Sequence, residues 1–187
     1  SAHVFRSKND GPTILVAGGV HGDEINGVEI VRRAVYSDLF KNLNCGTVIA
    51  LPLVNIYGFI NFSRELPDGK DVNRSFPGSK TGSLASRVAQ VITKEILPHI
   101  DMGLDFHTGG ASIYNYPQCR AYREDEQSLS LAKIFNAPLT IESGLVSRSL
   151  RKEAFKHDIP MIVYEGGESL RLDDFSITEV LLINIPN

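Results

Sequence analysis

The sequence predicts an α/β fold with a mainly parallel sheet. Short apolar runs rich in β-branched residues alternate with segments of roughly ten or more residues in which apolar side chains recur at helical spacing. The chain has 187 residues, of which 42% are hydrophobic and 22% charged, a composition typical of a globular protein with a full core. No internal repeat, low-complexity segment or linker is visible, so we expect residues 1–187 to form a single domain.

Four apolar runs predict buried strands, and a shorter run predicts a fifth. Pro52 marks the end of a strand or a bulge, because proline cannot donate a hydrogen bond to a neighbouring strand. The expected strands cover residues 13–17, 47–54, 102–106 and 161–164, with the short one at 139–141.

Helices are expected where apolar residues follow a period of 3.6, at residues 26–40, 84–97, 125–135 and 149–157. Asn26 is the expected cap of the first helix. The basic pairs Arg32-Arg33 and Arg151-Lys152 are interpreted as solvated helix faces.

The stretch from residue 55 to residue 80 shows no helical period and is rich in Gly, Pro, Asp, Asn and Ser. A loop this long inside a compact domain is usually functional or disordered. Its spaced aromatic and charged residues argue against disorder, so we expect it to be functional.

Composition excludes several classes of protein. The net charge is −3 and no run of Lys or Arg exceeds two, so we expect no nucleic-acid partner. No apolar run approaches the ~18 residues that span a bilayer, so we expect no membrane segment. Cys45 and Cys119 form no CxxC pair, which favours reduced thiols in a cytoplasmic protein. The N-terminus shows no signal-peptide pattern, and nothing in the sequence indicates an oligomeric state.

Three polar clusters each follow a predicted strand directly: HGDE at 21–24, DFHTGG at 105–110 and EGGE at 165–168. In open α/β sheets, ligands bind at the carboxyl ends of the strands. Clusters far apart in the sequence can therefore converge on one site.

His21 and Glu24 lie three residues apart on a turn that enters a helix, so both side chains can reach one ion. Catalytic zinc usually has three protein ligands and favours imidazole and carboxylate donors. Of the five histidines, His107 alone follows a buried strand and opens a glycine-rich turn, which makes it the best candidate for the third ligand.

Each of these features has a structural alternative. An H-x-x-E pair is common by chance, and a histidine after a strand can simply bond to backbone. Their combination beside glycines favours a metal site over these alternatives. Asp105 shares a strand face with His107, and it either orients a ligand imidazole or caps a loop.

The segments HGDEINGVE, DVNRSFPG and DFHTG, followed by a late strand that ends in Glu, occur in an order that resembles the succinylglutamate desuccinylase/aspartoacylase family. That family is related to the zinc carboxypeptidases, and the resemblance runs from Gly11 to Asp173. It implies a mixed, mainly parallel sheet flanked by helices on both faces, a zinc carboxypeptidase-like (phosphorylase/hydrolase-like) fold. It also implies one Zn²⁺ per chain, held by His21, Glu24 and His107.

The resemblance further implies roles for four residues outside the ligand set. Glu165 would be the catalytic acid and base, and Arg64 would stabilise the oxyanion. Asn73 and Arg74 would bind a substrate carboxylate. The alternatives are that Glu165 pairs with an arginine at the edge of the core, with Glu168 as a second candidate for the base, and that the two arginines are surface charges.

The family hydrolyses the amide bond of N-acyl amino acids. We therefore expect a zinc-dependent deacylase whose partner is a small acylated amino acid. A zinc carboxypeptidase acting on peptides and an inactive metal-binding domain are the alternatives. Family members usually carry more chain on both sides, so we expect these residues to lack the family's C-terminal portion.

Overall fold

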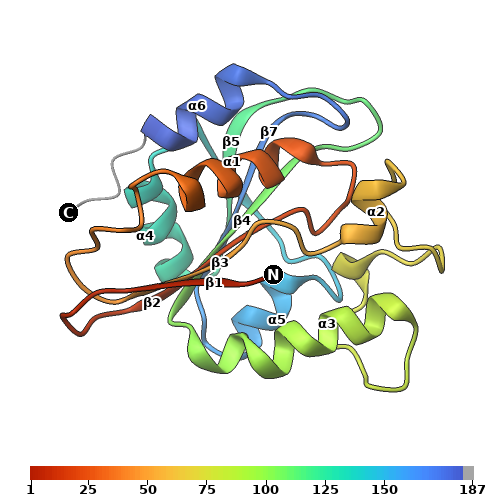
Figure 1. Cartoon of the computed structure of the whole chain (residues 1–187), viewed down its shortest axis with the longest axis horizontal. Coiled ribbons are helices and arrows are strands. Elements are labelled where there is room, and N and C mark those ends of the chain that lie inside the picture. The colour runs from red at the N-terminus through yellow and green to blue at the C-terminus, as the bar shows by residue number, and fades with distance from the viewer. Residues whose placement is uncertain (183–187) are drawn as a thin grey trace.

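The computed structural model describes residues 1–182, and within them seven strands form one sheet in the order β1-β3-β2-β4-β7-β5-β6 (Figure 1). Four neighbouring pairs are parallel, whereas β1–β3 and β5–β7 are antiparallel. The mixed, mainly parallel sheet is therefore confirmed. The strands are β1 (His3–Arg6), β2 (Thr13–Gly18), β3 (Thr47–Leu51), β4 (Met102–Gly109), β5 (Asn115–Tyr122), β6 (Leu139–Ser143) and β7 (Met161–Glu168).

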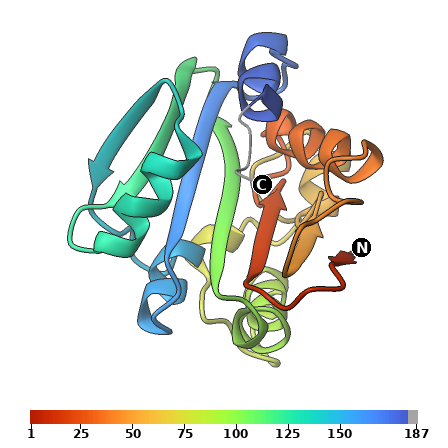
Figure 2. The ribbon, with the colours of Figure 1, turned by 90° about the vertical axis from the view of Figure 1, so that its left-hand side faces the viewer.

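Helices cover both faces of the sheet, as Figures 1 and 2 show. One core cluster joins the sheet to α1, α4 and α6, and a second joins the opposite face to α3 and α5. Neighbouring β2 residues alternate between the two, with Val16 in the first cluster and Leu15 and Ala17 in the second. The helices are α1 (Ile25–Tyr36), α2 (Ile56–Ile60), α3 (Leu84–Glu95), α4 (Glu126–Phe135), α5 (Leu150–Lys156) and α6 (Asp174–Leu182), with 3-10 turns η1 (Val72–Arg74) and η2 (Leu97–His99).

Side-chain caps explain where three helices begin. Ser83, Asp125 and Ser149 each accept a hydrogen bond from a backbone N–H of the first turn of α3, α4 and α5. Helix α4 ends at Asn136 in the left-handed conformation, which asparagine tolerates better than most residues.

The expectation that Asn26 caps the first helix is wrong. Glu24 occupies the cap position of α1 and makes no side-chain cap bond. Asn26 lies inside the helix, where its amide donates to the Gly166 carbonyl (3.0 Å) and accepts from the Asp173 N–H (2.9 Å). Its side chain thus ties α1 to β7 instead of closing its own helix.

Several boundaries differ from the expected ones. β3 ends at Leu51, immediately before Pro52, which has no N–H to extend a ladder. β4 and β7 each continue beyond the apolar run, so His107 and Glu165 lie within strands rather than after them. The structure also contains β1, β5 and α6, which the apolar patterns did not predict, and the loop after β3 contains α2 and η1.

Both cysteines are free, Cys45 at the surface and Cys119 in the core. None of the helices within residues 1–182 is both long enough and apolar enough to span a lipid bilayer.

Candidate metal centre

The HGDE segment forms the turn between β2 and α1, and it presents two side chains to the end of the sheet. His21 lies in the turn, and Glu24 immediately precedes the helix. The turn packs tightly on α2, because a Cβ at Gly22 would lie 2.0 Å from the Gly58 carbonyl carbon. Glycine is therefore required at this position, so that the turn carrying His21 and Glu24 can pack against α2.

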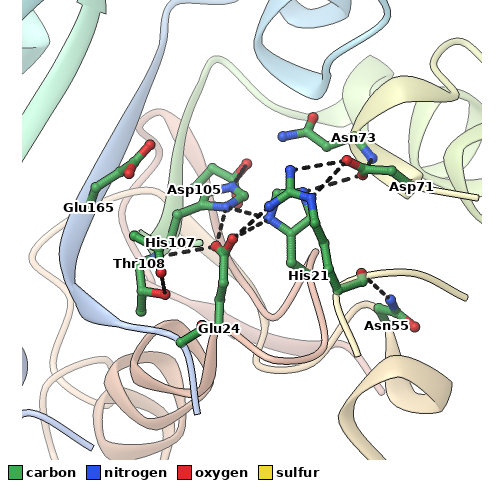
Figure 3. Close-up of polar contacts among 12 residues, drawn as sticks. His21, Glu24, Asn55, Asp71, Asn73, Asp105, His107, Thr108 and Glu165 are labelled. Atoms are coloured by element: carbon green, nitrogen blue, oxygen red, sulfur yellow. Dashed lines mark hydrogen bonds and ion pairs between the residues drawn. The ribbon is translucent and has the colours of Figure 1, made fainter. Parts of the chain in front are cut away.

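His21, Glu24 and His107 meet in the interior of the protein (Figure 3). One carboxylate oxygen of Glu24 lies 2.7 Å from His21 Nδ1, and the other lies 2.7 Å from His107 Nδ1. The two Nδ1 atoms are 3.1 Å apart. Two imidazole nitrogens and a carboxylate from separate stretches of chain thus converge on one point.

A second carboxylate faces the far nitrogen of each imidazole. Asp105 Oδ2 lies 2.8 Å from His107 Nε2, and Asp71 Oδ1 lies 3.3 Å from His21 Nε2. A carboxylate at this position keeps the proton on Nε2 and leaves the Nδ1 lone pair free for a metal. Asp105 therefore orients the imidazole of His107, and the loop-capping alternative is not what the structure shows. Asp71 lies beside His21 as an ion-pair partner, although Nε2 makes no hydrogen bond to it. The sequence analysis missed Asp71 although it begins the DVNRSFPG segment.

The donor set fits a divalent cation on chemical grounds. With both Nε2 atoms protonated, two Nδ1 lone pairs and the Glu24 carboxylate would face one another across 3.1 Å or less. That arrangement needs a positive charge between the donors. Two imidazoles and a carboxylate are ligands that zinc accepts.

The nearby carboxylates favour positive charge on the two imidazoles. Burial lowers the pKa of His21 and of His107, but the surrounding carboxylates outweigh it and raise both pKa values above the usual range. Burial would raise the pKa of Glu24, yet the two histidines hold it well below its usual value. The carboxylate is therefore ionised, as a ligand must be.

All seven residues predicted for the site line one cavity of about 360 Å³. Glu165 on β7 pairs in register with His107 on β4, so the two side chains lie on the same face of the sheet (Figure 3). Arg64 binds Glu24 and Asp71, with N···O distances of 3.0 Å to each.

Asn73 and Arg74 also line the cavity, and both lie in the η1 turn. The Asn73 side-chain oxygen accepts from the Leu150 N–H (2.8 Å), which fixes the amide against the start of α5. Arg74 is exposed and donates to the Asn73 carbonyl (2.7 Å).

The cavity residues that the sequence analysis missed include Asn115, Arg120 and Arg151. The interpretation of Arg151 as part of a solvated helix face is wrong, because its side chain is buried. It donates to the carbonyls of Arg120 (3.1 Å) and Gly144 (3.0 Å) and to the Ser143 hydroxyl (3.1 Å). A basic pair in the sequence cannot reveal that one member points into a cavity. By contrast, Arg32 and Arg33 do lie near the surface, where they bind Glu29.

Comparison with solved structures confirms the fold. The product-bound ectoine utilization protein EutE (DoeB) from Ruegeria pomeroyi superposes with a TM-score of 0.88 at 25% identity, over 96% of this chain and 56% of that one. A succinylglutamate desuccinylase/aspartoacylase from Rhodobacter sphaeroides gives a TM-score of 0.84 at 30% identity, over 92% of this chain and 53% of that one. The zinc carboxypeptidase-like fold expected from the resemblance is therefore correct.

Sequence comparison identifies the family. The N-alpha-acetyl-L-2,4-diaminobutyric acid deacetylase of Halomonas elongata is 34% identical over 140 residues, which are 72% of this chain and 41% of that protein. The chain thus spans less than half the length of this curated relative. Residues 10–185 match the model of the succinylglutamate desuccinylase/aspartoacylase catalytic domain. The chain belongs to the succinylglutamate desuccinylase/aspartoacylase family.

Proposed function

We propose that this chain is the catalytic domain of a zinc-dependent deacylase, which hydrolyses the amide bond of a small N-acyl amino acid or a related acylated amine. One Zn²⁺ per chain would be held by His21, Glu24 and His107. The observation that carries the proposal is the three-donor cluster, which shares a cavity with the carboxylate of Glu165. The family and the deacetylase activity named for the Halomonas relative support this substrate class.

A bound zinc ion supplies Lewis-acid chemistry, polarising a carbonyl oxygen and making a water molecule acidic enough to be a nucleophile near neutral pH. Glu165 would take a proton from the attacking water as its oxygen bonds to the acyl carbon. It would then deliver that proton to the amine nitrogen as the C–N bond breaks. Burial raises the pKa of Glu165, against the lowering effects of His107 and Arg120, and a raised pKa suits a group that must both accept and return a proton.

Three further residues complete the proposed machinery. Arg64 borders the proposed ligand Glu24, and its guanidinium would stabilise the oxyanion that develops beside the metal. Asn73 uses its side-chain oxygen for the Leu150 N–H, and its NH₂ has no partner within residues 1–182. That NH₂ and the Arg74 guanidinium would bind the substrate carboxylate.

The decisive test replaces Glu165 by Gln. Turnover on a panel of N-acyl amino acids should fall about 10²–10⁴-fold because the base is lost. Zinc per chain, measured by elemental analysis, should stay unchanged. Glu168→Gln is the matched control, since Glu168 lies on the same strand but pairs with Arg171 (2.8 Å) at the cavity's exterior.

Turnover that survives Glu165→Gln would remove Glu165 as the base. A dipeptide panel assayed in parallel separates the deacylase from a peptide-cleaving carboxypeptidase, and no turnover on either panel by the zinc-loaded chain would reject both. The single-domain organisation of residues 1–187 and a cytoplasmic location are part of the same proposal.

A further inference from the structure

The strand next to Glu165 departs from a regular ladder. β5 runs antiparallel to β7, and Gln118 pairs with Glu165. A regular ladder would pair Asn115 with Glu168, but Asn115 pairs with Gly167. β5 therefore contains one extra residue between 115 and 118, a stretch that includes Pro117, which has no N–H to contribute. Such bulges turn a side chain away from its regular direction and are frequent beside active sites.

The bulge directs Asn115 to the carboxylate of Glu165. The Asn115 NH₂ group donates to Oε2 of Glu165. Arg120, two residues beyond Gln118 on the same strand, places its Nε 3.4 Å from Oε1. Oε2 thus accepts a hydrogen bond from Asn115, whereas Oε1 has an ion-pair contact with Arg120, and both partners come from β5.

The Glu165 carboxylate is also held in place by its surroundings. The Glu165 side chain is only 18% exposed, and His107 is its neighbour on β4. The Arg120 backbone is in turn held by Arg151 of α5, which donates to the Arg120 carbonyl (3.1 Å). Both partners of the carboxylate therefore lie on a strand of the sheet, as a group that orients a reactive side chain must lie on a rigid element.

We propose that Asn115 and Arg120 are positioning residues that hold the Glu165 carboxylate in one orientation toward the metal centre. The inference rests on the proposed function, in which Glu165 is the base. A glutamate side chain has several rotamers, and only some bring its carboxylate to the attacking water. Fixing the orientation before substrate binds raises kcat without contributing to substrate affinity.

A double-mutant cycle on the full zinc-loaded chain tests whether Asn115 acts through Glu165. Asn115→Ala should lower kcat about tenfold to a hundredfold and leave KM unchanged. In a Glu165→Gln background, the same change should alter kcat less than about twofold, because the base it positions is absent. Asn115→Asp, which keeps the shape but loses the donor, should behave like Asn115→Ala. Arg120→Lys should retain more activity than Arg120→Met.

Zinc per chain and the thermal midpoint should not change in any of these variants. Arg123→Met is the control, since Arg123 is an exposed arginine just beyond β5. An Asn115→Ala effect of equal size in both backgrounds, or no effect on kcat, would overturn the inference. If Glu165→Gln alone has no effect, the proposed function fails instead.

A measurement independent of activity closes the argument. In crystals of the zinc-loaded wild type, the Glu165 carboxylate should adopt one conformer facing Asn115. In Asn115→Ala crystals it should occupy more than one. A single unchanged conformer in the variant would refute a positioning role even if the chain turned over no substrate.

Discussion

Replacing Asp105 by Asn should weaken zinc binding without dismantling the site. Asp105 is buried at 1% exposure, and its Oδ2 lies 2.8 Å from Nε2 of His107. Its other oxygen has no hydrogen-bond partner within residues 1–182. The substitution keeps the shape of the side chain and removes its charge, so it isolates the electrostatic part of the contact.

The expected magnitude follows from the role of that contact. In Asp105→Asn the side-chain oxygen can still accept the Nε2 proton, so His107 keeps Nδ1 free for the metal. The neutral amide no longer increases the basicity of the imidazole. Loss of such an outer carboxylate typically weakens metal binding about 10–100-fold, which corresponds to ~1.4–2.8 kcal/mol.

Competition between the protein and a chromophoric zinc chelator measures the dissociation constant directly. Asp158→Asn is the matched control, because Asp158 is exposed and its positive φ of 58° is one that asparagine tolerates. The control should bind zinc as the wild type does. A dissociation constant for Asp105→Asn within about twofold of wild type would refute the assigned role of Asp105.

Two further outcomes are expected. Free zinc at about 100 times its dissociation constant should add ~2.7 kcal/mol to the free energy of unfolding, which corresponds to roughly 5–11 °C in the thermal midpoint of a domain this size. Scanning fluorimetry would show this shift in wild type, and a comparable shift in His107→Ala would contradict the ligand assignment. Hydrogen bonds from Arg32, and then from Arg33, lower the pKa of Glu29 to about 2, so its stabilising contribution is present above its usual pKa of 4.5 and lost as the pH falls toward 2. Because the pair is near the surface, Glu29→Gln should lower the free energy of unfolding by less than ~1 kcal/mol at neutral pH and by nothing near pH 2, as urea denaturation would measure.

The meeting of His21, Glu24 and His107 could be predicted because these residues lie at the ends of neighbouring parallel strands. A buried apolar run predicts each strand. Because the strands are parallel, the polar residues that follow them lie at the same edge of the sheet. His21 and Glu24 were found from their spacing, and His107 from its place after the apolar run of β4. The helices on both faces follow equally from local periodicity.

The surroundings of the cluster could not be predicted, because they depend on contacts between segments with no local signal. β5 has the sequence NYPQCRAY, whose polar residues and proline break the apolar pattern that would predict a strand. Asn115 and Arg120 acquire their importance only from the register of β5 against β7. In the sequence, Arg151 and Lys152 form a basic pair typical of a helix surface. Only the packing of α5 shows that the Arg151 side chain is buried in the cavity wall.

The charges around His21, Glu24 and His107 nearly balance those of one divalent cation. Glu24, Asp71 and Asp105 contribute three negative charges near the donor atoms, and Arg64 contributes one positive charge. With neutral imidazoles, two negative charges remain, which is what one divalent cation balances. Elsewhere in the cavity, Arg120 faces Glu165, whereas Arg74 and Arg151 have no carboxylate partner within residues 1–182. Arg151 is buried, and buried positive charge without a partner is unfavourable in the free protein. Under the proposed function, a substrate carboxylate would offset this cost, so Arg151 joins Arg74 as a candidate to bind the acid group of an acylated amino acid.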